Sequence, residues 1–260
     1  MKGDSSMILK NKVVIVTGAA RGLGRAFSQR FAAEGAKVVC ADISDASETV
    51  SLIKADGGEA LCVHVNISDF ASVQEMCKLA EDTYGGIDGL VNNAAIYAGI
   101  AMEPFHLITE EEWDRVMNVN VKGTWLCCKA VYPYMIKRGG GSIVNIASAS
   151  ILEGNPFFAH YTAGKGAVWA LSRSISRVVG EQGIRCNSIT PGYTMTEASK
   201  SLAGDPESFQ KNYDYSIQTR AIHRAMEADD VVGGVLFLLS DDSAFMTGQN
   251  MNIDGGCINY

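Results

Sequence analysis

The chain has 260 residues, of which 47% are hydrophobic and 20% charged, a composition typical of a globular protein with a large core. The formal net charge is -7 and no long basic run is present, so neither nucleic acid nor an anionic membrane is expected as a partner. No apolar stretch is long enough to span a bilayer, and the polar N-terminus lacks a signal-peptide core, so we expect a cytoplasmic location. The seven cysteines include no C-x-x-C pair and the four histidines no metal-ligand spacing; we expect reduced thiols and no metal site.

The first apolar run, residues 12–17, is typical of a buried parallel strand. It leads into the glycine-rich segment from Gly18 to Gly24 and then into a helical pattern over residues 26–34. In this order Gly18 permits a tight turn, Gly22 lets a pyrophosphate approach the backbone, and Gly24 allows close helix packing. The helix N-terminus would bind the phosphates, so the segment predicts a dinucleotide site. The alternative is a purely structural turn before a helix.

The second predicted strand, residues 37–42, ends in an acidic residue at about the distance from the glycines where a ribose-binding carboxylate is expected. Asp42 would accept hydrogen bonds from the ribose hydroxyls and repel a 2′-phosphate, which favours NAD over NADP. Arg21 is a contrary signal, because a cation beside the glycines could pair with that phosphate. Asp42 receives more weight because no Lys or Arg follows it closely. A helix-capping role for Asp42 is the alternative.

Strand-like and helix-like segments continue to alternate along the chain. Further strands are predicted at residues 60–65, 87–91, 142–147, 184–190 and 248–254, and helices at residues 70–84, 109–136, 157–180 and 229–239. This alternation predicts the α/β class, a single-domain doubly wound (Rossmann) parallel sheet of about seven strands with helices on both faces. Nothing marks a domain boundary within residues 1–260. The polar, poorly periodic segment at about 195–225 is predicted to be a mobile lid.

Tyr161 and Lys165 are four residues apart, which places them one turn apart on one face of the predicted helix. A neighbouring ammonium lowers the pKa of a tyrosine, and a tyrosine so tuned could exchange a proton with an alcohol oxygen near neutral pH. The same spacing also occurs in a packed tyrosine beside a solvated lysine. Asn120 lies inside another predicted helix, where it is either a solvated residue or a sign of a disturbed helical hydrogen bond.

Taken together, these residues resemble the short-chain dehydrogenase/reductase family, in its compact branch, over essentially the whole chain. Each motif is modest alone, but their order and spacing are highly specific together. The motifs are Thr17-Gly18-x-x-x-Gly22-x-Gly24, Asp42, Asn92-Asn93-Ala94, Asn120, Ser148, Tyr161-x-x-x-Lys165, Pro191-Gly192, Thr247-Gly248-Gln249 and Asp254-Gly255-Gly256.

The resemblance implies a role for each of four catalytic residues. Tyr161 would be the acid/base, and Lys165 the cation that lowers its pKa and holds the nicotinamide ribose. Ser148 would polarise the substrate oxygen, and Asn120 would anchor a water chain that relays protons. The implied cofactor contacts are Gly18, Arg21, Gly22, Leu23, Gly24, Asp42, Asn66, Ile67, Asn93, Tyr161, Lys165, Gly192, Thr194 and Thr196.

Two positions depart from the family pattern. Asn66 stands where the family usually has Asp, and its oxygen could still accept from the adenine amino group, so the change bears on affinity. Ala95 stands where the family usually has Gly, and its methyl group would trim the site behind the nicotinamide.

The resemblance implies an NAD(H)-dependent oxidoreductase of alcohols and ketones, and it implies a homotetramer. Mostly apolar and aromatic residues are expected around the substrate, which favours a small secondary alcohol or ketone, alicyclic or aromatic, over a sugar. The alternatives are a 3-oxoacyl thioester reductase, a sugar or polyol dehydrogenase, and a non-catalytic NAD-binding scaffold. The substrate contacts expected are Ser148, Tyr161, Ile96, Tyr97, Ser150, Phe158 and Tyr193.

Overall fold

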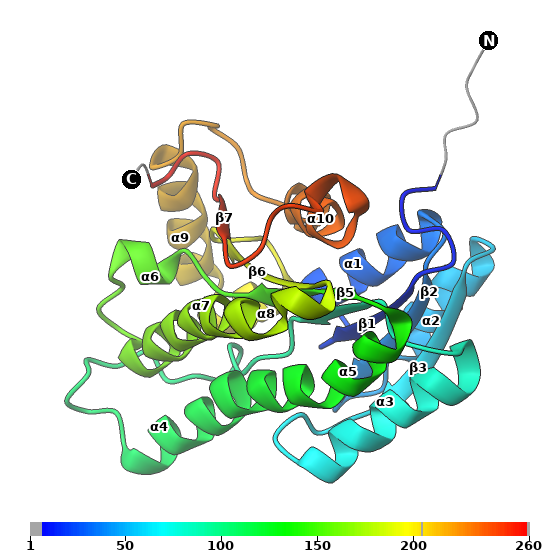
Figure 1. Cartoon of the computed structure of the whole chain (residues 1–260). Coiled ribbons are helices and arrows are strands. Elements are labelled where there is room, and N and C mark those ends of the chain that lie inside the picture. The colour runs from blue at the N-terminus through cyan, green and yellow to red at the C-terminus, as the bar shows by residue number, and fades with distance from the viewer. Residues whose placement is uncertain (1–6, 204, 259–260) are drawn as a thin grey trace.

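The computed structural model describes residues 7–203 and 205–258. Its centre is a seven-stranded parallel sheet in the order β3-β2-β1-β4-β5-β6-β7 (Figure 1). The doubly wound α/β fold predicted from the sequence is therefore confirmed. The strands are β1 (Val13–Thr17), β2 (Lys37–Asp42), β3 (Glu59–His64), β4 (Gly89–Asn92), β5 (Gly141–Ile146), β6 (Ile184–Pro191) and β7 (Asn250–Ile253).

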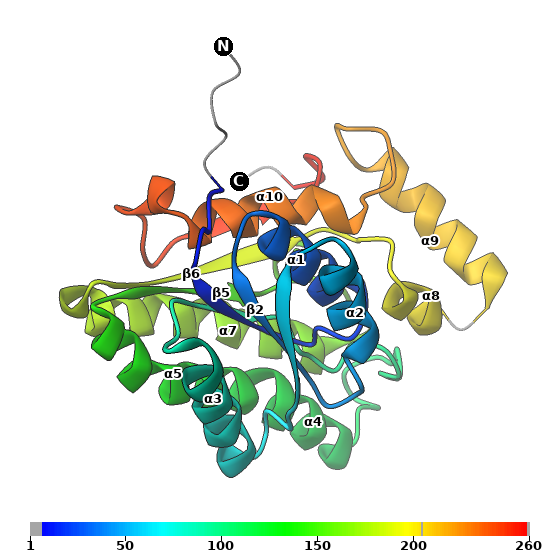
Figure 2. The same ribbon diagram turned by 90° about the vertical axis from the view of Figure 1, so that its right-hand side faces the viewer.

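Helices cover both faces of the sheet. α1, α2 and α10 pack on one face, and α3, α5 and α7 pack on the other (Figures 1 and 2). The helices are α1 (Gly22–Ala33), α2 (Ser47–Ala55), α3 (Phe70–Tyr84), α4 (Glu110–Met117), α5 (Thr124–Arg138), α6 (Ser150–Glu153), α7 (Ala159–Val179), α8 (Glu197–Ala203), α9 (Pro206–Gln218) and α10 (Ala228–Leu239), with a π-helix at Asn118–Gly123 and 3-10 turns at Gly180–Gln182 and Asp241–Ser243. No helix within the described residues is long and apolar enough to cross a membrane.

The strand order explains where a ligand can bind. All five residues of β1 are buried, as expected for a parallel strand covered on both faces. From β1 the chain winds outward to β2 and β3, and from its other neighbour, β4, it winds outward to β5, β6 and β7. The loops after β1 and β4 therefore diverge to opposite faces, which opens a crevice at the carboxyl ends of these strands.

The turn between β1 and α1 has the backbone conformation that its glycine residues predict. Gly18 and Gly22 have φ of 69° and 56°, in the left-handed region that glycine adopts at little cost. A Cβ on Gly24 would lie 2.0 Å from the carbonyl oxygen of Gly18, so only glycine fits at this helix–strand contact.

Two segments differ from the sequence expectations. The helix expected from 109 to 136 begins as predicted, with Thr109 capping Glu112 N at 3.2 Å, but it is divided by the π-helix Asn118–Gly123. The expected lid at about 195–225 is largely helical, because it contains α8 and α9. Asp205 caps α9 by accepting hydrogen bonds from the backbone of Glu207 and Ser208.

We expect replacement of Gly24 by alanine to lower the free energy of unfolding by about 1–3 kcal/mol, because the added methyl group overlaps backbone. Gly233, in the exposed side of α10, has no heavy atom within 4 Å of a built Cβ, so Gly233→Ala should be neutral or stabilising by about 0.5–1 kcal/mol. Urea unfolding of both variants measures the difference. Equal stability of the two would contradict the close contact at Gly24.

Candidate active site

One cleft of about 960 Å³ runs across the carboxyl ends of the strands. The cleft is lined by the glycine turn, by the region of Ser148 and Tyr161, and by α8, α9 and the segment around Cys257. α8 begins beside the glycine turn, because Thr196 and Glu197 lie within 4 Å of a Cβ built on Gly22. Every site residue predicted from the sequence lines this cleft except Gly24 and Asn120. The structure thus brings the predicted cofactor and substrate contacts into one continuous site.

Tyr161 and Lys165 lie in the first turns of α7, where both are buried, with 7% and 4% of their surface exposed. The Lys165 Nζ lies 5.8 Å from the centre of the Tyr161 ring and donates a 2.7 Å hydrogen bond to the carbonyl oxygen of Ile146, the last residue of β5. Ser148, two residues beyond β5, lies close enough to the Tyr161 hydroxyl to lower its pKa. The three side chains predicted to act together therefore converge.

The expected lowering of the Tyr161 pKa is wrong for this arrangement. Burial raises the pKa of Tyr161 to about 12, and only the interaction with Ser148 opposes it. The reason is that desolvation disfavours a phenolate, while the Lys165 ammonium is bonded to the Ile146 carbonyl. Burial also lowers the pKa of Lys165 to about 8, so this amine exchanges protons near physiological pH.

Asn120 lies in the π-helix and is 1% exposed. Its Oδ1 accepts from the backbone N–H of Ile96 at 2.7 Å and its Nδ2 donates to the Ile96 carbonyl at 3.1 Å, while its own carbonyl accepts from Thr124 Oγ1 at 2.8 Å. The disturbed helix considered from the sequence is confirmed. Asn120 thus ties the π-helix to Ile96 in the loop after β4 and does not itself line the cleft. Its role as the anchor of a water chain stays a prediction.

The glycine end of the cleft fits a dinucleotide. Within the described chain no side chain caps the N-terminus of α1, so its first N–H groups can receive an anion. A Cβ built on Gly22 would be in van der Waals contact with Thr196, 3.7 Å away, so Thr196 faces the turn, and both residues line the cleft. Asn93 Nδ2 donates to the carbonyl oxygens of Thr17 and Gly18 at 3.0 and 3.1 Å and fixes the turn from below.

Two further residues of this end are fixed by local hydrogen bonds. The Asp42 carboxylate accepts from the backbone N–H of Ala20 at 2.9 Å and of Ser44 at 2.8 Å, so it joins β2 to the glycine turn and does not cap a helix. Asn66 Oδ1 accepts from the N–H of Ser68 at 3.1 Å and from its hydroxyl at 2.7 Å. The oxygen expected to face adenine is therefore engaged locally.

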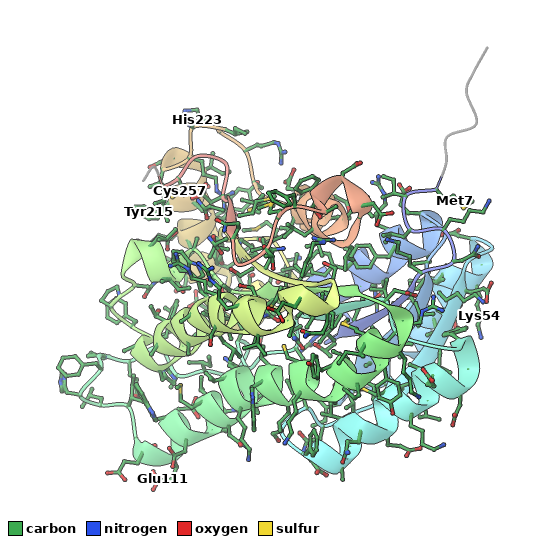
Figure 3. All side chains as sticks on the ribbon, in the orientation of Figure 1. Met7, Lys54, Glu111, Tyr215, His223 and Cys257 are labelled. Atoms are coloured by element: carbon green, nitrogen blue, oxygen red, sulfur yellow. The ribbon has the colours of Figure 1, made fainter. Side chains whose placement is uncertain are left out.

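The middle of the cleft has an aromatic wall. The ring of Tyr97 lies 5.3 Å from that of Tyr161, and the ring of Phe158 meets Tyr161 edge-on at 5.6 Å. Ile96 and Leu202 pack against this cluster. The sequence analysis missed the lining residues Leu202, Tyr215 and Cys257; Figure 3 shows Tyr215 and Cys257 near one another at the α9 end of the molecule. The Asp205-Pro206 helix start could have revealed α9, but not its contact with the cleft.

Comparison with known proteins agrees with this geometry. A family model described as enoyl-(acyl carrier protein) reductase matches residues 18–258. Galactitol 2-dehydrogenase of Agrobacterium fabrum is 38% identical, over 96% of this chain and 98% of its own, and meso-2,3-butanediol dehydrogenase of Serratia marcescens is 38% identical, over 96% of each. The crystal structure of levodione reductase superimposes with a TM-score of 0.86 at 32% identity, covering 95% of this chain and 97% of that one.

The chain therefore belongs to the short-chain dehydrogenase/reductase family and is an oxidoreductase of the alcohol and ketone kind, with a site for a nicotinamide cofactor.

Buried Lys165 should cost stability at neutral pH. Its pKa falls from 10.5 to about 8 on folding, so protonated Lys165 destabilises the fold by on the order of 3 kcal/mol below pH 8, and this cost disappears as the pH rises from about 8 to 10.5. We expect Lys165→Met to have a higher free energy of unfolding than the wild type at pH 6.5, because the cost of the buried charge is removed. The loss of the hydrogen bond to Ile146 reduces this gain. At pH 9.5 the gain should be smaller. Urea unfolding at both pH values measures this. A stability difference that does not change with pH would show that Lys165 titrates normally.

Proposed function

We propose that the protein is an NAD(H)-dependent dehydrogenase that interconverts a small, mostly apolar secondary alcohol, alicyclic or aromatic, and its ketone. The observation that carries the proposal is the convergence of Ser148, Tyr161 and Lys165 in the cleft that begins at the glycine turn. In a non-catalytic scaffold, the buried Lys165 ammonium would lower stability without a compensating role in catalysis.

A bound nicotinamide supplies hydride transfer to or from the substrate carbon. In the proposed reaction Tyr161 exchanges a proton with the substrate oxygen, and the hydroxyl of Ser148 donates a hydrogen bond to the same oxygen as charge develops. Lys165, whose pKa is about 8, can pass a proton onward and stabilise a phenolate beside it. Asn120 keeps the loop with Ile96 at the edge of this group.

The choice of NAD rests on Asp42. Its carboxylate closes β2 at the glycine turn, where the cleft begins, and its position is fixed by two backbone N–H groups. A fixed negative charge beside the adenosine ribose would oppose a 2′-phosphate. Arg21 also lines the cleft and is the residue that would favour NADP if Asp42 were neutralised.

The aromatic wall of Tyr97 and Phe158 supports a mostly apolar substrate. A 3-oxoacyl thioester is the second candidate, favoured by the description of the matching family model. Such a substrate would need a basic mouth, for which Arg220 and Arg224 are the candidates. Arg224 forms a two-bond ion pair with Asp230, and Arg220 is only 3% exposed, so neither presents an open cation at the mouth.

We also propose that the protein forms a homotetramer and is cytoplasmic, as the family resemblance implies. Large apolar side chains on the outer sides of α4, α5 and α7 support self-association: Trp113, Trp125, Ile136 and Val178. Sedimentation analysis would test the assembly.

A screen of cyclic and aryl alcohols and ketones with NAD(H) and NADP(H) tests the activity, and Tyr161→Phe tests the mechanism. We expect this variant to bind NADH normally but to lose about a hundredfold to ten-thousandfold in kcat, because the proton donor is gone. Fluorescence titration and steady-state rates measure the two effects. Tyr134→Phe, outside the cleft on α5, is the control. Turnover by Tyr161→Phe at the wild-type rate would remove Tyr161 from its role.

We expect Asp42→Asn to reduce the preference for NAD over NADP, measured as the ratio of the two kcat/KM values, by about tenfold to a hundredfold. Hydrogen bonds to a charged group contribute a free energy of this size. The same ratio in Asp45→Asn should stay at the wild-type value, because Asp45 bonds the backbone of Ser47 and lies outside the cleft. An unchanged ratio in Asp42→Asn would mean that the specificity lies elsewhere.

A further inference from the structure

The cleft contains two ionisable side chains, Glu153 and Arg220, for which the proposed reaction has no role. Glu153 is the last residue of α6, which begins two residues after Ser148, and Arg220 lies two residues after the end of α9. Both line the same cleft as Tyr161. The cleft therefore contains charged groups in addition to its aromatic wall.

Arg220 is held firmly in the cleft wall. It is 3% exposed, its guanidinium donates to the backbone carbonyl oxygens of Tyr193 and Arg224, and Gly255 lies so close that a Cβ there would be 3.2 Å from Arg220 Cδ. Among the described residues no carboxylate lies within 4.0 Å of it. A guanidinium has five N–H donors, and the hydrogen bonds of the described residues use only its two terminal nitrogens.

Glu153 supplies the complementary group. Within residues 7–203 and 205–258 its carboxylate accepts no hydrogen bond, so its oxygens remain available as acceptors. Glu153 is exposed at the cleft; partial desolvation and the nearby charge of Asp254 raise its pKa, and the charge of Arg220 opposes that rise. Glu153 also lies near enough to Tyr97 to influence the hydroxyl of that residue. Glu153 therefore lies near both Arg220 and Tyr97 of the aromatic wall.

We propose that Glu153 and Arg220 form a polar subsite that binds a second oxygen of the substrate, so that the enzyme prefers a diol or a hydroxy ketone to a simple alcohol. This inference rests on the proposed function. A substrate hydroxyl would donate to the Glu153 carboxylate, and a hydroxyl or carbonyl oxygen would accept from Arg220. The mostly apolar carbon skeleton would lie against Tyr97 and Phe158, with its reacting carbon beside Tyr161.

The preference for a second oxygen has an energetic basis. A site that offers a buried charged hydrogen-bonding group discriminates strongly against a ligand that leaves this group unpaired. An apolar pocket alone separates two ligands of similar size only weakly. Arg220 is such a buried group, and Glu153, whose residue is exposed, adds a charged acceptor near it, so these two residues would determine the specificity of this part of the cleft.

The test compares cyclohexanol with 1,2-, 1,3- and 1,4-cyclohexanediol as substrates of the wild type and of Glu153→Gln. We expect the wild type to prefer at least one diol by about tenfold or more in kcat/KM, since a hydrogen bond to a charged group contributes that much. Glu153→Gln should lose about tenfold or more on that diol, mainly through a higher KM, and change by less than about twofold on cyclohexanol. Arg220→Lys, which retains the charge but not the fixed fork of donors, should also raise KM for the diol.

The control is Glu111→Gln, at an exposed position of α4 far from Tyr215 and Cys257 at the other end of the molecule (Figure 3). Thermal unfolding verifies that each variant is folded. A wild type that turns over cyclohexanol and all diols equally, or a Glu153→Gln variant that loses the same factor on both, would overturn the subsite while leaving the dehydrogenase activity in place. A wild type that turns over no alcohol or ketone would overturn both.

Discussion

The burial of the Lys165 ammonium is the constraint on which the site depends. Moving a charged amine out of water is costly unless it is paired, and here the hydrogen bond within the described residues is to a single backbone carbonyl, that of Ile146. That bond joins α7 to the end of β5, and it brings Tyr161 to the same place as Ser148. The fold accepts a local loss of stability for a lysine whose pKa lies near neutrality.

The position of the Ile146 carbonyl is fixed from below by a buried polar network. Asn145, the residue before it, accepts a 2.8 Å hydrogen bond from Asn92 of β4 and donates a 2.9 Å bond to Ser172 of α7. All three side chains are at most 4% exposed. Because buried amides must be satisfied by particular partners, this network sets the register of β4, β5 and α7 more narrowly than apolar packing could.

The sequence predicts the features that have a local physical cause. Buried runs predict the strands, Gly18 and Gly24 predict a turn that other residues cannot make, and a four-residue spacing predicts that Tyr161 and Lys165 share a helix face. What it does not predict depends on tertiary contacts. The bonds of Asn120 to Ile96 join segments far apart in sequence, and the raised pKa of Tyr161 follows from desolvation by the surrounding fold. The helices α8 and α9 were missed because their sequences are dominated by polar residues.

The two sides of the cleft are consequently built in different ways. The catalytic side is attached to strand ends and to the long helix α7, so its geometry follows from the sheet. The opposite side is formed by α8, α9 and the residues after β7, which are joined by a few contacts such as Arg220 to the Tyr193 carbonyl and Ile222 N to the Gly255 carbonyl at 2.9 Å. Changes there alter the substrate that fits without disturbing the reacting groups. A chain of this family can thus keep one chemistry while its substrate changes, because the two properties depend on different elements of the fold.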